Sequence, residues 1–119
     1  MTLDALGRLK GREAVAPPLL WSEVTSVLHD LRWRGAISRE LADIAFLNFR
    51  SAEIALRRPS RLYEEAWAVA TRRGWAKTYD AEYVALAQIL HCPLLTIDGR
   101  LARGVADLIE VIGPTDLEG

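Results

Sequence analysis

The sequence is poor in cysteine, lacks any long apolar run and carries almost no net charge. Cys92 is the single cysteine among 119 residues, so no disulfide can form within the chain, which favours a reducing, cytoplasmic location. No apolar run approaches the ~20 residues of a membrane-spanning helix, and no membrane partner is expected. The formal net charge of −1 gives no general attraction to nucleic acid, so RNA affinity would require a local basic patch.

Half of the residues are hydrophobic, enough for one compact domain covering residues 1–119. Apolar side chains recur at helical spacing in four longer segments, which predicts four helices. Their expected starts are Leu19, Ser38, Ser60 and Thr78; a shorter helix is expected at Arg100–Arg103, and strands at Ala14–Ala16, Pro93–Asp98 and Leu108–Ile112. The alternation of helix and strand late in the chain favours an α/β fold, with a parallel sheet covered by helices.

Two aspartates lie near the ends of the segment TYDAEYVALAQILHCPLLTID, residues 78–98. A helix over Thr78–His91 would run roughly 21 Å, and a strand over Pro93–Asp98 would return roughly 20 Å. If the two pack antiparallel, Asp80 and Asp98 meet at the carboxyl edge of the sheet, where open α/β folds bind ligands. The structural alternative is that Asp80 caps a helix and Asp98 opens the turn DGR.

Glu23 is the third acid that this topology directs to the same edge. It follows the Ala14–Ala16 strand and lies early in the next helix, on the flank of the apolar stripe. Glu23, Asp80 and Asp98 would repel one another without a cation, whereas Mg²⁺ or Mn²⁺ takes carboxylate oxygens as ligands. A metal held in this way can activate water for phosphodiester hydrolysis.

Three segments of the sequence resemble the later motifs of PIN-domain ribonucleases, and most closely the VapC-type toxins of bacterial toxin–antitoxin pairs. They are VAPPLLWSEVTSVL (15–28), TYDAEYVALAQ (78–88) and PLLTIDGRLAR (93–103). The resemblance implies an α/β/α sandwich that cleaves RNA with Mg²⁺ or Mn²⁺. It implies that Glu23, Asp80 and Asp98 are catalytic metal ligands, and that Thr96 supports them. It also implies a cognate antitoxin and a homodimer as partners.

The beginning of the sequence departs from the family pattern. Members of the family open with an apolar strand that ends in a metal-binding aspartate, whereas this chain opens MTLDALGRLKGREAV. We therefore expect the first strand to be absent through N-terminal truncation, and Thr2–Lys10 to be the tail of the first helix. The alternative is that Asp4 replaces the missing aspartate. Loss of that strand would leave the backbone of its neighbours unpaired.

Two other functions remain open from the sequence. One is a catalytically impaired PIN-fold remnant that acts as a binding or regulatory module, and the other is a receiver-like phosphoacceptor domain.

Several side chains have a structural and a functional interpretation. The cations at Arg57, Arg58, Arg61, Arg72, Arg73 and Lys77 would be a solvated surface or phosphate contacts. Inward-facing positions are expected at Leu41, Ile44, Ala45 and Phe49, and core or interface anchors at Trp21, Trp33, Trp67 and Trp75.

Overall fold

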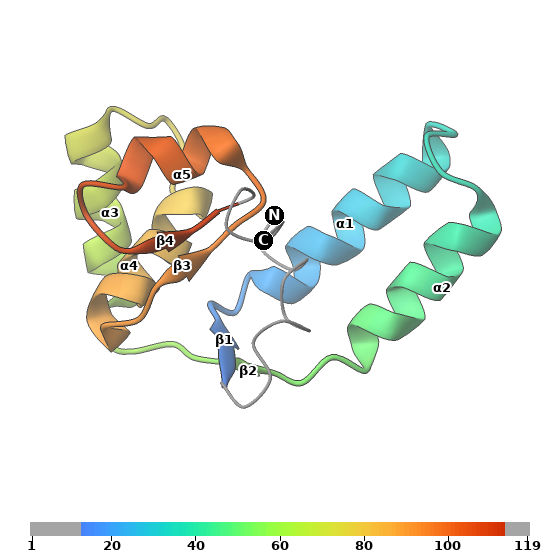
Figure 1. The fold of residues 1–119 in the computed structure, drawn as a ribbon, viewed down its shortest axis with the longest axis horizontal. Helices are drawn as coiled ribbons and strands as arrows, with labels where there is room; N and C mark the ends of the chain where they lie inside the picture. Colours follow the sequence, from blue (N-terminus) through green and yellow to red (C-terminus); the bar gives the residue numbers. More distant parts are fainter. Residues whose placement is uncertain (1–12, 114–119) are drawn as a thin grey trace.

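The computed structural model describes residues 13–113, which form short strands and longer helices in alternation (Figure 1). In chain order the elements are β1 (Ala14–Ala16), α1 (Leu20–Trp33), α2 (Arg39–Arg50), β2 (Ile54–Leu56), α3 (Leu62–Arg73), α4 (Tyr79–Leu90), β3 (Leu94–Leu95), α5 (Gly99–Val105) and β4 (Val111–Ile112). The mixed α/β class expected from the sequence is confirmed. The predictions for Thr2–Lys10 and Asp4 lie outside the described residues.

The described strands pair in parallel, as expected, but they form two sheets of two strands each. β1 pairs with β2, and β3 pairs with β4. On the side of β3 that faces β4, the N–H groups of Leu94 and Thr96 donate hydrogen bonds to the carbonyl oxygens of Glu110 and Ile112. Because backbone groups alternate in direction along a strand, those of Leu95 point away from β4. The sheet expected as one layer is therefore divided into two halves within residues 13–113.

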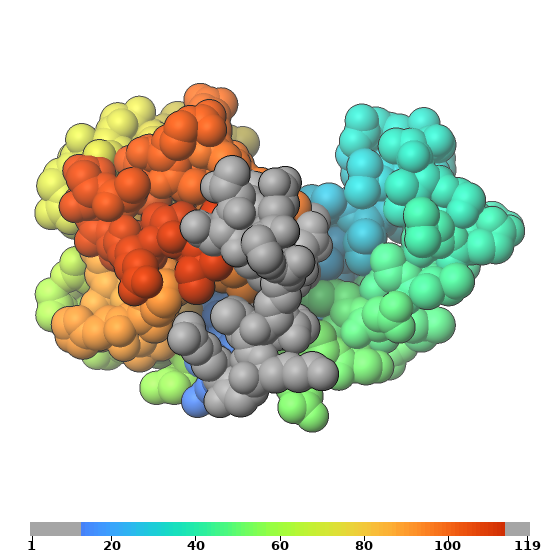
Figure 2. All heavy atoms as spheres, viewed as in Figure 1, coloured from blue at the N-terminus to red at the C-terminus, as the bar shows by residue number. Residues whose placement is uncertain are grey.

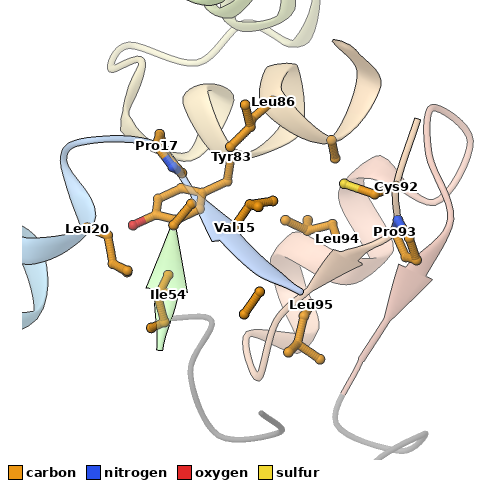
Figure 3. A pocket seen from close by; sticks show the side chains of 13 residues that line it. Val15, Pro17, Leu20, Ile54, Tyr83, Leu86, Cys92, Pro93, Leu94 and Leu95 are labelled. Carbon is orange, nitrogen blue, oxygen red and sulfur yellow. The ribbon is translucent and has the colours of Figure 1, made fainter. Parts of the chain in front are cut away.

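An apolar cavity of about 100 Å³ lies between the two halves of the sheet. Figure 3 shows side chains from β1 and β3 facing it, together with Tyr83 and Leu86 of α4. Cys92 also lines this cavity, and its burial raises the pKa of the thiol. In this surrounding Cys92 acts as a small apolar side chain and not as a nucleophile, since the reactive form of cysteine is the thiolate.

Helix α4 forms the centre of the hydrophobic core. All seven residues from Ala81 to Ala87 are buried, and Val84 and Ala85 are fully inaccessible. Helix α3 packs along α4 and contributes Leu62 and Val69, which are also fully buried. Gly74 ends α3 with a φ of +69°, a left-handed conformation that glycine adopts without a Cβ clash. The core therefore fixes the first turn of α4, where Asp80 lies.

Helices α1 and α2 form a hairpin that projects from the rest of the molecule (Figures 1 and 2). The Ser38 hydroxyl caps α2 by accepting a hydrogen bond from the Leu41 N–H. The prediction that Leu41 and Ile44 face inward is wrong, because more than half of each side chain is exposed. Phe49 is buried as expected, and Ala42 is buried as well. Because α2 packs mainly against α1, only one narrow apolar stripe of α2 is covered, and the apolar side chains next to that stripe stay exposed to solvent.

Two of the four tryptophans lie outside the core, so of the two expected roles only that of an interface anchor stays a prediction for them. Trp33 and Trp67 are 80% and 72% exposed, respectively. Trp21 packs against Phe49 with ring centroids 4.5 Å apart. None of the helices within residues 13–113 is both long enough and apolar enough to cross a bilayer.

Candidate active site

An open pocket of about 680 Å³ is lined by acids from three separate segments. Glu23 comes from the first turn of α1, Asp80 from the first turn of α4, and Asp98 from the residue preceding α5. The remaining lining residues include Trp75, Lys77, Tyr79, Arg100 and Leu101. The structure thus brings the three acids named from the sequence to a common pocket.

Glu23 is held by a hydrogen bond from another helix. Its Oε1 atom accepts a hydrogen bond from the Tyr83 hydroxyl, with 2.9 Å between the two oxygens. Glu23 is half-buried, and its backbone N–H donates to the Leu19 carbonyl within the first turn of α1. The carboxylate therefore has one oxygen engaged with α4, which leaves Oε2 for a ligand.

Asp80 is exposed in the positively polarised first turn of α4, a position that favours a carboxylate. Thr78 is the residue at the N-cap, as expected, but its side chain forms no capping hydrogen bond. The backbone of Thr78 has φ −103° and ψ 3°, outside the extended conformation that a capping side chain normally requires. The position of the Asp80 side chain is therefore set by the backbone of the first turn of α4 and not by a capping hydrogen bond from Thr78.

Asp98 caps α5 and is itself held by Thr96. Its Oδ1 atom accepts hydrogen bonds from the N–H groups of Arg100 and Leu101, at 3.0 and 3.1 Å. Thr96 is fully buried, and its hydroxyl oxygen accepts a hydrogen bond from the Asp98 N–H at 3.0 Å. The sequence alternative had Asp98 opening the turn DGR, whereas Gly99 and Arg100 begin α5 and Asp98 is its N-cap. This structural role is compatible with a site role because Oδ2 lies outside the cap.

Glu82 is a buried acid beside this pocket that was not among the acids predicted from the sequence. Its side chain is 8% exposed, and burial together with the charge of Glu23 raises its pKa. Burial and the neighbouring Glu23 also raise the pKa of Tyr83. An acidic residue in the otherwise apolar run AEYVALA was the signal available in the sequence. Glu23 therefore lies within the electrostatic reach of the first turns of α4.

The cations near the acids are fewer than the sequence suggested. Lys77 lines the acidic pocket, together with Arg100, which was not among the predicted cations. Arg61 pairs with Glu65 on its own helix, and Arg73 pairs with Asp107 at 2.7 Å. The positive charge available at the pocket therefore comes from the segments that flank Asp80 and Asp98.

The donor set of the pocket consists of carboxylate oxygens, which suits a hard divalent cation. Within residues 13–113, however, no three His, Cys, Asp or Glu side chains lie close enough together to hold a metal ion. One oxygen of Glu23 and one of Asp98 are engaged by Tyr83 and by the α5 backbone. A cation would therefore have to use the other oxygens, and rotation of the exposed Asp80 side chain would have to bring the carboxylates together.

The fold and the pocket define an α/β domain in which acids from the first turns of α1 and α4 and from the N-cap of α5 line one pocket. A family model described as "PIN domain" matches residues 2–106, and the chain belongs to this family. The expected resemblance is confirmed by similar proteins. Ribonuclease VapC9 and Ribonuclease VapC3 of Mycobacterium tuberculosis are 34% and 35% identical over 86 and 88 residues. These alignments cover 72% and 74% of the chain, and 65% and 62% of the two relatives.

Proposed function

We propose that the chain is a metal-dependent endoribonuclease of the VapC type, the toxin component of a toxin–antitoxin pair. The observation that carries the proposal is the common pocket of Glu23, Asp80 and Asp98. The ribonuclease names of its relatives support it. The reaction is hydrolysis of an RNA phosphodiester bond, for which a bound Mg²⁺ or Mn²⁺ would supply charge stabilisation and an activated water.

The residues of the pocket divide into two roles in this proposal. The free oxygens of Glu23, Asp80 and Asp98 would bind the cation and accept hydrogen bonds from the attacking water. Thr96 would hold the backbone of Asp98 through its hydroxyl. Lys77 and Arg100 line the same pocket and would contact the phosphates on either side of the cleaved bond.

The aromatic side chains of the pocket favour an unpaired RNA strand as the substrate. Trp75 and Tyr79 line the pocket, and Tyr79 is 57% exposed. An exposed ring provides a stacking surface for a base that is not already paired. We expect faster cleavage of a single-stranded RNA than of a duplex with the same sequence.

A cleavage assay tests the proposal directly. RNA would be incubated with Mg²⁺ or Mn²⁺ and with the wild-type chain, Asp80→Asn or Asp43→Asn. Asp43 is an exposed acid on α2, outside the acidic pocket, so this variant has the same change in charge at a distant position. We expect cleavage by the wild type and Asp43→Asn, and none by Asp80→Asn or in the presence of chelator. Cleavage by Asp80→Asn at the wild-type rate would contradict the proposal.

The second candidate is a catalytically impaired PIN-fold domain that acts as a binding or regulatory module. It is favoured by the separation of the acids, no three of which lie at metal-binding distance within residues 13–113. This candidate predicts RNA or protein binding without any cleavage in the same assay. Chelator would then leave binding unchanged.

The proposed partners are RNA, a cognate antitoxin and a second copy of the chain, all in the cytoplasm. An antitoxin would inhibit by placing a basic side chain near the acids. The exposed Leu41, Ile44 and Leu47 on α2 provide apolar surface that a protein partner could cover. Light scattering over a range of concentrations tests the homodimer, and a constant monomer mass would contradict it.

A further inference from the structure

The Tyr83 side chain connects the apolar interior with the acidic pocket. Its ring lines the cavity between the two half-sheets, as Figure 3 shows, and only 7% of the residue is exposed. Its hydroxyl leaves the apolar surroundings and donates a hydrogen bond to Oε1 of Glu23 at 2.9 Å. This contact joins α4 to α1 across 60 positions of the sequence.

The geometry of α4 relates this hydrogen bond to a second acid of the pocket. Asp80 precedes Tyr83 by three positions, so the two side chains lie on neighbouring turns of one helix face. The hydroxyl of Tyr83 thereby holds the acid of α1 close to the turn that carries the acid of α4. A buried phenol also requires a hydrogen-bond acceptor, and Glu23 is the acceptor that residues 13–113 provide.

We propose that Tyr83 is a positioning residue that presents Glu23 to the cation of the acidic pocket. The hydrogen bond engages Oε1, restricts rotation of the carboxylate, and leaves Oε2 as the metal-binding oxygen. Such supporting partners of metal ligands typically change metal affinity by about 10–100-fold when they are removed. This inference rests on the proposed function, because it requires the pocket to bind a divalent cation.

Mn²⁺ binding to the full chain, measured by titration calorimetry, tests the inference without any RNA. The proteins would be the wild type, Tyr83→Phe, Glu23→Gln and the double variant. Phenylalanine keeps the ring in the apolar cavity and removes only the hydroxyl. We expect Tyr83→Phe to weaken Mn²⁺ binding by about 10-fold or more. In the Glu23→Gln background the same change should have no further effect, because Tyr83 acts through Glu23.

A tyrosine outside the pocket provides the matched control. Tyr63 lies on α3, is 52% exposed and does not line the acidic pocket, so Tyr63→Phe should leave Mn²⁺ affinity unchanged. If Tyr83→Phe does not fold by circular dichroism, Tyr83→Met replaces it. Methionine adapts to apolar space and also lacks the hydroxyl, so Mn²⁺ affinity should fall in the same way.

The possible results separate the inference from the function on which it rests. A wild-type chain that binds no Mn²⁺ would reject the metal site, and the role of Tyr83 with it. Wild-type binding with unchanged affinity in Tyr83→Phe would reject the positioning role alone. An equal loss in the presence and absence of Glu23 would also reject it, since the hydroxyl would then act through general packing.

Discussion

Asp98 allows the structural and functional roles of one carboxylate to be separated by substitution. Its Oδ1 atom caps α5 through the N–H groups of Arg100 and Leu101. Asp98→Ala removes this cap, and loss of an N-cap side chain costs about 0.5–2 kcal/mol. Asp98→Asn keeps an oxygen at the same position, and asparagine caps helices about as well as aspartate. The alanine variant should therefore lose stability and the asparagine variant should keep it, apart from a small helix-dipole contribution.

Urea unfolding should distinguish the two variants, whereas RNA cleavage should not. With a denaturant slope of about 2 kcal/mol per molar urea, loss of 1 kcal/mol lowers the midpoint by roughly 0.5 M. We expect this decrease for Asp98→Ala and little change for Asp98→Asn. Both should lose cleavage, because both remove the negative charge that a cation requires. Loss of the cap should affect global unfolding because α5 belongs to the core: its residues Leu101 and Val105 are buried there.

Ser38→Ala is the matched control for the loss of a cap. Ser38 accepts a hydrogen bond from the Leu41 N–H at the start of α2, and neither residue lines the acidic pocket. This variant should lose a similar amount of stability while cleavage continues. Full cleavage by Asp98→Asn would refute the reasoning, because Asp98 would then be a helix cap only. An asparagine variant as unstable as the alanine variant would refute the cap.

Further predictions concern the support of the site, the core and the surface. Thr96→Val should destabilise the domain by roughly 1–3 kcal/mol, because a partly buried N–H loses its acceptor; urea unfolding would show this. Leu62→Ala should cost about 2–5 kcal/mol and Leu41→Ala no more than about 0.5 kcal/mol, and equal midpoint shifts would contradict the assigned burial. The hydrogen bond from Arg73 lowers the pKa of Asp107 in the folded protein. The stabilisation of the fold by this pair is therefore present above the unfolded pKa near 3.9 and is lost as pH falls through the lower folded pKa. Arg73→Gln should therefore be less stable than the wild type at about pH 6, and the difference should shrink below about pH 3, as urea midpoints at both pH values would reveal.

The sequence predicted best those elements that local chemistry determines. The strand Ala14–Ala16 is observed with the expected bounds, since two prolines end it. Ser38 caps α2 at the expected start of that helix, because its side chain acts on the backbone next to it. The meeting of Glu23 with the α4 turn followed from the order of the elements. Local signals and topology were therefore sufficient for the positions of these residues.

Other features depend on contacts that a single sequence does not encode locally. The strand Ile54–Leu56 was missed because three residues are too few to display an alternating pattern. Leu41 and Ile44 follow helical spacing, yet α2 has few neighbours that could cover them. The partner of Glu23 was also missed, because the Tyr83 hydroxyl is 60 positions away and its ring belongs to the core.

The location of a bound divalent ion is the most direct test of the account. Crystals soaked in Mn²⁺ would be measured for anomalous scattering, which identifies the ion without any assumption about catalysis. The account predicts an anomalous peak in the acidic pocket, with oxygens of Glu23, Asp80 and Asp98 around it at about 2.0–2.3 Å. A fully soaked crystal without a peak in this pocket, or with the ion bound on another face, would contradict it.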